Sequence, residues 1–146
     1  MPTAARLVAA ILLASFGWIM SDMIRPLMPE GTAFGRFNYI NAVIGLCVGW
    51  IAMGSRAGRG IVPGINNGFT GVVLLFIWGF AVHSSIRMFQ ESMKRRYDDP
   101  MEAFASIFLI ASDFAIEIAT APVIITSIAS AVVIGCLVEF SAGRWR

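Results

Sequence analysis

The sequence predicts an all-α membrane protein with four transmembrane helices, short loops and an amphipathic helical segment before the last span. Hydrophobic residues make up 58% of the chain, charged residues make up 14%, and the mean hydropathy is +0.77. Soluble domains average about 45–50% apolar and about 25% charged residues. A soluble domain of 146 residues could not bury this much apolar surface, so lipid must cover the excess.

Four apolar runs have the length that a membrane span requires, which is roughly 17–25 residues. We expect the spans at residues 7–24, 37–53, 61–85 and 121–140, within a single integral membrane domain that covers residues 1–146. The first run follows one arginine and could be mistaken for a signal peptide. It has the length of a full span and no small-residue cleavage site after it, so we interpret it as an uncleaved helix.

The glycine-rich stretch at residues 45–71 organises the predicted fold, because it holds eight of the fourteen glycines. Four-residue spacing predicts one glycine stripe on each of two successive helices, separated by a short basic turn at residues 54–60. In a bilayer, helices gain by close packing, and small residues four apart let backbones approach. We therefore interpret the stretch as a membrane hairpin, with five glycines as helix-packing positions: Gly45, Gly49, Gly60, Gly64 and Gly68.

Two asparagines, Asn66 and Asn67, lie within the third predicted span. Amide groups need partners in hydrocarbon, so at least one of them should face another helix and contribute an interhelical hydrogen bond. The helical pattern continues past residue 85 through Arg87 towards Met93. A third helix of that length would project from the bilayer into water.

Residues 103–138 are too long for one span and are open to two interpretations. In the favoured one, residues 102–120 form an amphipathic helix at the interface and residues 121–140 form the fourth span. In the other, one long tilted helix kinks near Pro122. The favoured interpretation depends on Thr120, which stands where an N-cap is expected, just before a proline.

The charges at the two membrane surfaces do not fix the orientation by number, because the eleven lysines and arginines divide into five and six. Four spans place both termini on one side. That side carries few acids beside its cations, whereas the other side carries most of the Asp and Glu residues. We therefore expect cytoplasmic termini, with five arginines on that side: Arg6, Arg56, Arg59, Arg144 and Arg146.

Ionisable groups at membrane depth are the default functional candidates. His83 and Arg87 are four residues apart on one helix face, and Asp113 and Glu117 are four apart on the next helix. If the two helices run antiparallel, these faces could meet as an ion-pair or polar cluster. The more specific alternative is that the four residues form a proton relay or a cation site. No metal site is predicted, since three ligands across two helices is a weak pattern.

The sequence contains no catalytic fingerprint. It lacks a P-loop, a zinc-protease helix motif, a nucleophile elbow and a dinucleotide motif. We expect no enzyme activity and no catalytic residues. A nucleic-acid partner is not expected either, since net charge is only +2 and no basic stripe lies on a polar domain.

Several stretches resemble the TrgA-type family. They are Met1–Leu7, Asn41–Gly45, the block Met53–Gly60 followed by Ile65–Gly68, and Arg95–Asp98, together with the charged C-terminus. That family comprises small inner-membrane proteins of alphaproteobacteria named for a link to tellurium resistance. The resemblance covers most of the chain and implies a bacterial inner membrane, cytoplasmic or intracytoplasmic. It carries over no catalytic residue.

Two functions are open from these observations. The first is a non-enzymatic accessory or structural subunit that packs against a larger energy-transducing membrane complex, either respiratory or a photosynthetic light-harvesting–reaction-centre core. Membrane lipids would then be bound, and contact with the partner's pigments or quinone is expected, although no intrinsic cofactor is. The alternative is a tellurium-resistance or small-ion transport protein that acts as a homo-oligomer, because one four-span chain rarely encloses a pathway.

Overall fold

The computed structural model describes residues 4–28, 35–95 and 97–145, and over these residues the chain is all-α. Its four long apolar segments, Ala4–Leu27, Phe37–Arg56, Ile61–Met93 and Ala121–Arg144, could each cross a membrane by length and composition. The predicted fold class is therefore confirmed. The first residues of the family resemblance, Arg96 and the predicted cytoplasmic Arg146 lie outside the described residues.

The elements in chain order are α1 (Ala4–Ile24), η1 (Arg25–Leu27), α2 (Phe37–Val48), η2 (Gly49–Met53), η3 (Gly54–Arg56), α3 (Ile61–Met93), α4 (Pro100–Ile118) and α5 (Ala121–Arg144).

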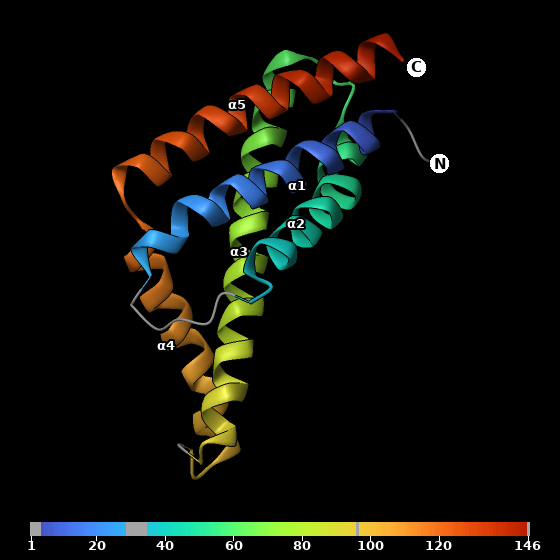
Figure 1. Ribbon diagram of the computed structural model, residues 1–146. Coiled ribbons are helices and arrows are strands. Elements are labelled where there is room, and N and C mark those ends of the chain that lie inside the picture. The colour runs from blue at the N-terminus through green and yellow to red at the C-terminus, as the bar shows by residue number, and fades with distance from the viewer. Residues whose placement is uncertain (1–3, 29–34, 96, 146) are drawn as a thin grey trace.

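The helices form two structural parts (Figure 1). Helix α1 lies between α2 and α5, and the first half of α3 crosses this layer and packs on it. The second half of α3 leaves the layer and pairs with α4, which runs back along it as a helical hairpin. Both described chain ends lie at the same end of the molecule, close to the turn between η3 and α3, as four spans require.

Helix α3 has 33 residues and ends at Met93, eight residues beyond the predicted span. At 1.5 Å per residue it is about 50 Å long, whereas the hydrocarbon core of a bilayer is about 30 Å thick. The predicted extension of this helix is therefore present. Because α4 turns back along it, the part of α3 beyond the predicted span belongs to a hairpin of two helices.

The break between α4 and α5 decides between the two interpretations of residues 103–138. Helix α4 ends at Ile118 and α5 begins at Ala121, with an extended Thr120 between them. Two helices are present, and the single kinked helix is wrong. Thr120 holds the N-cap position but its side chain makes no capping hydrogen bond, so proline in the first turn begins α5 without that cap.

The first glycine stripe packs α2 onto α1. A Cβ atom added at Gly45 would overlap the carbonyl oxygen of Leu13, and one at Gly49 would overlap that of Ala9. The backbones of these two helices are therefore in direct contact at two points along the stripe. After Gly49 the helix widens into a π turn, which places Met53 in the core at 1% exposure.

The second glycine stripe packs α3 onto α5. A Cβ at Gly68 would overlap the carbonyl oxygen of Ala131, and one at Gly135 would lie 2.5 Å from the carbonyl oxygen of Gly64. The two stripes of the predicted hairpin thus face outward to α1 and α5 rather than to each other. This follows because each stripe contacts the helix that also presents a small residue, Ala9 on α1 or Ala131 on α5.

Gly60 does not belong to the second stripe, and its assignment as a helix-packing position is wrong. It precedes the first residue of α3 and has a φ angle of +112°. An added Cβ would contact nothing nearer than 3.9 Å. The requirement for glycine here comes from the left-handed backbone conformation that starts the helix, because other residues rarely adopt it.

Candidate functional site

A buried chain of hydrogen bonds joins α3, α2 and α1 inside the helix layer. His83 Nε2 lies 2.9 Å from Asn41 Oδ1, Asn41 Nδ2 donates to Ser21 Oγ at 2.8 Å, and Ser21 Oγ donates to the Gly17 carbonyl at 2.7 Å. Asn41 is 7% exposed and Ser21 is fully buried. Asn41 and Ser21 are therefore shielded from the surroundings of the helices, whereas His83 is half-buried.

The direction of each hydrogen bond follows from the last acceptor. The Gly17 carbonyl can only accept, so the Ser21 hydroxyl donates to it and accepts from the Asn41 amide. The amide oxygen of Asn41 then faces His83, and it too can only accept. His83 accordingly carries its proton on Nε2, and its ring stacks on Phe37 with the ring centroids 4.4 Å apart.

A second polar contact extends the connection between α1 and α2 towards the helix ends. Asn38 Nδ2 donates to Asp22 Oδ1 at 2.7 Å, and Asn38 is 4% exposed. Sequence reasoning did not select Asn38, Asn41 or Asp22 as site residues. One signal was available in the sequence. Asn38 and Asn41 lie seven and four residues before Gly45, so they share its helix face.

A cavity of about 40 Å³ lies beside this chain and is lined by His83, Asn41, Gly17 and apolar side chains that include Phe114 of α4. It has room for a few water molecules, since one requires about 10–15 Å³. Of the described residues that line it, His83 is the one with a titratable side chain. The arrangement connects three helices, and among the described residues it brings no second proton-carrying group to the cavity.

The predicted cluster of His83, Arg87, Asp113 and Glu117 is only partly assembled. The α3 and α4 faces do meet, but the Arg87 guanidinium lies over the Phe114 ring, 5.4 Å from its centroid, and pairs with Glu91 at 3.4 Å. Tyr97 also donates to Glu91, at 2.9 Å. Among the described residues, Arg87 therefore takes its ion pair from its own helix rather than from α4.

The two α4 carboxylates lie at the flank of that contact. Asp113 is exposed, whereas Glu117 is half-buried and its Oε2 has no hydrogen-bond partner among the described residues. Phe114 and Ile110 occupy the centre of the buried face instead. The rotation of α4 about its axis, set by these apolar residues, is what keeps the carboxylates away from His83. The described residues also contain no group of three His, Cys, Asp or Glu side chains that could hold a metal ion.

The two asparagines of the third span differ in environment. Asn67 is 7% exposed, and its Nδ2 donates to the Met53 carbonyl at 2.7 Å. That carbonyl lies in the last turn before η3, where helix carbonyls lack intrahelical donors. Asn66 is exposed, and its backbone carbonyl accepts from Thr70 Oγ1. Asn67 alone of the pair contributes a hydrogen bond between segments.

Glu139 of α5 is a site residue that sequence reasoning did not select. Its carboxylate accepts from the backbone N–H groups of Gly58, at 2.9 Å, and Gly60. Both glycines have positive φ angles, so the turn presents its N–H groups to one carboxylate. The available signal was an acidic residue near the end of an otherwise apolar span, which normally has a specific partner.

Replacement of Asn41 by leucine is expected to weaken the three-helix connection. The change removes two hydrogen bonds, each on the order of 0.6 kcal/mol in membrane proteins, and leaves His83 Nε2 without its acceptor. We expect a modest loss of thermal stability in detergent. We also expect the ¹⁵N shifts of the single histidine to change from one tautomer to a mixture. Asn66→Leu, at an exposed position, is the control, and unchanged histidine shifts in Asn41→Leu would contradict the assigned network.

Comparison with known proteins gives no match to the chain, whether with protein-family models, curated proteins or solved structures.

Proposed function

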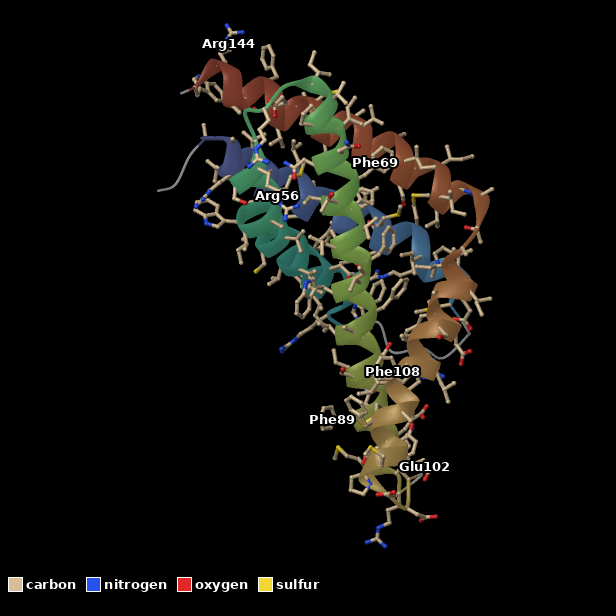
Figure 2. All side chains as sticks on the ribbon, turned by 180° about the vertical axis from the view of Figure 1, so that it is seen from behind. Arg56, Phe69, Phe89, Glu102, Phe108 and Arg144 are labelled. Atoms are coloured by element: carbon tan, nitrogen blue, oxygen red, sulfur yellow. The ribbon has the colours of Figure 1, made fainter. Side chains whose placement is uncertain are left out.

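We propose that this multi-span helical membrane protein is a non-enzymatic accessory subunit that docks on a larger energy-transducing membrane complex through the α3–α4 hairpin. The observation that carries the proposal is the chemistry of the hairpin surface. Its outward face has large apolar side chains, and charged residues adjoin them near the tip (Figure 2). The exposed apolar residues of the hairpin include Phe89, Met93, Met101, Phe104, Phe108, Leu109 and Ile116.

The outward face of α4 is apolar rather than polar. Phe104 and Phe108 are 58% and 63% exposed and contact each other edge to face, with centroids 5.6 Å apart. A helix at a water-facing surface would instead carry polar residues on its outer side. This face therefore requires a covering layer of lipid or protein.

The tip of the hairpin favours protein as the covering layer. Met93 is 87% exposed and Met101 is 70% exposed, and they lie next to Lys94, Asp99 and Glu102 along the chain. Lipid chains would solvate the methionine side chains but not the charged groups. Water would solvate the charged groups but not the methionine side chains. Protein interfaces combine an apolar centre with a polar rim, and aromatic residues and methionine are enriched in them.

The class of partner is inferred from the family resemblance. The resemblance to small inner-membrane proteins of alphaproteobacteria suggests a host with respiratory or photosynthetic complexes. An energy-transducing complex is accordingly the proposed partner, with its pigments or quinone as neighbours of the exposed aromatic side chains. A subunit of this kind needs helix packing and a docking face, and it needs no catalytic group.

The test is co-purification from the native membrane. We expect the C-terminally tagged protein, extracted in a lipid-retaining detergent, to migrate on a native gel with a stoichiometric large complex. The band would be identified by mass spectrometry and its absorption spectrum. The double variant Phe104→Ser/Phe108→Ser should release the complex, whereas Ile125→Ser/Ile128→Ser, at exposed positions on α5, should retain it.

Migration of the wild-type protein as a small homo-oligomer without partners would contradict this proposal. The same result would favour the alternative, a homo-oligomeric tellurium-resistance or small-ion transport protein. Asp113, Glu117 and His83 would then be the residues to replace in a resistance or transport assay.

A further inference from the structure

The end of the molecule that carries the chain termini has a groove between the basic turn and the first turns of α3. We propose that this groove binds the phosphate of an anionic phospholipid whose headgroup carries a hydroxyl, as phosphatidylglycerol does. Figure 2 shows Arg56 beside the first half of α3, at the opposite end of that helix from the α4 hairpin. The groove has a volume of about 250 Å³ and is lined by Arg56, Arg59, Val62, Pro63, Asn66, Asn67 and Thr70; we call it the arginine groove.

Two guanidinium groups supply the charge for a phosphate. Arg56 and Arg59 are both exposed, and within the described part of the chain neither has a hydrogen-bond or ion-pair partner. Arginine binds phosphate oxygens in a bidentate manner. Glu139, an acid that contacts the same turn, already accepts two of its backbone N–H groups. The groove is therefore positively charged and its cations are available.

The basic turn is held in place before any ligand binds. Gly58 and Gly60 lie on either side of Arg59, and both donate their backbone N–H groups to Glu139 of α5. The first backbone N–H groups of α3 lack intrahelical acceptors, as at any helix start, and they add positive potential to the same end. This preorganisation reduces the ordering cost of binding.

Asn67 contributes an unpartnered acceptor beside the groove, and this motivates the choice of a ligand that carries a hydroxyl donor. Its side chain is more than nine-tenths buried, lines the groove and donates to the Met53 carbonyl. Its Oδ1 is buried and has no partner among the described residues. An amide oxygen in this state needs a donor. A phosphate diester has none, whereas the glycerol headgroup of phosphatidylglycerol has two hydroxyl groups.

The wall of the arginine groove continues into the bilayer as an apolar surface. Val62, Asn66 and Thr70 share one face of α3, and helical spacing places Val73 and Ile77 on the same face. The last two are 53% and 54% exposed. A lipid with its phosphate in the groove can thus lay its acyl chains along this face. This continuity favours a lipid headgroup over a free phosphate ion.

The test is lipid binding to the delipidated full-length protein, measured by native mass spectrometry. Dioctanoyl phosphatidylglycerol should bind at least tenfold more tightly than dioctanoyl phosphatidylcholine. Arg56→Ala/Arg59→Ala should weaken phosphatidylglycerol binding at least tenfold. Lys94→Ala/Arg144→Ala removes the same charge from exposed positions outside the groove and should bind like the wild type.

Two outcomes would overturn the proposal. One is equal phosphatidylglycerol binding by the wild type and the Arg56→Ala/Arg59→Ala variant. The other is displacement of the lipid by inorganic phosphate at similar concentration, which would assign the groove to a free anion. Arg56→Lys/Arg59→Lys, which keeps the charge but loses the bidentate geometry, should bind with intermediate affinity and verifies that binding tracks the guanidinium groups.

Discussion

Replacement of Gly68 by alanine is expected to destabilise the protein strongly. The added Cβ would overlap the carbonyl oxygen of Ala131 and lie 3.0 Å from the Cα of Gly135. Both are backbone atoms, so no side chain can rotate away. Helices α3 and α5 would have to separate, at a cost of about 3 kcal/mol as for overpacked cores.

The measurement is thermal unfolding in detergent, followed by tryptophan fluorescence. For a chain of this size, that loss corresponds to a decrease in Tm of about 6–12 °C. Gly143→Ala is the matched control, because nothing lies within 4 Å of its added Cβ. Alanine is the better helix former by about 1 kcal/mol, so the control should be neutral or slightly stabilising.

A second substitution tests the origin of the effect. Because the overlap involves the Ala131 carbonyl, Ala131→Gly removes no atom that meets the new methyl group. The Tm of the double variant Gly68→Ala/Ala131→Gly should therefore be no higher than the Tm of Gly68→Ala. Rescue by the double variant, or an unchanged Tm in the single one, would show that α3 and α5 are not in backbone contact at this point.

Replacement of Glu139 by alanine is expected to release the turn between η3 and α3. The change removes two hydrogen bonds to a carboxylate, each on the order of 1.5–3 kcal/mol, although water can hydrate the exposed Gly60 N–H and recover part of this loss. Trypsin cleavage after Arg56 and Arg59 in detergent should become at least tenfold faster. This corresponds to about 1.4 kcal/mol of easier opening.

Two further variants identify the carboxylate as the cause. Glu139→Gln keeps one acceptor oxygen but turns an amide donor towards a backbone donor, so its cleavage rate should lie between those of the wild type and Glu139→Ala. Glu102→Ala removes an exposed acid at the hairpin tip and should leave cleavage at the turn unchanged. Equal digestion of Glu139→Ala and the wild type would mean that the turn does not depend on α5.

The amino-acid sequence by itself determined four apolar helices long enough to span a membrane, the extension of the third helix beyond residue 85 and the helical segment before the last span. These features depend on local quantities. A span requires a run of apolar residues matched to the bilayer thickness, and Pro100 and Pro122 mark helix starts from the chain alone. The spacing of Gly45, Gly49, Gly64 and Gly68 likewise indicated close packing, because helical periodicity fixes which residues share a face.

The partners of those faces were decided only by the tertiary structure. Asn41 and His83 are 42 residues apart, and Gly58 and Glu139 are 81 apart. No local pattern relates them, since rotation of each helix about its axis depends on packing against all its neighbours. The same cause explains why the predicted cluster is only partly assembled. Phe114 lies in the α3–α4 contact, and Asp113 lies at the exposed flank of that contact. Local periodicity thus determined which residues share a face, and packing among distant helices determined what each face meets.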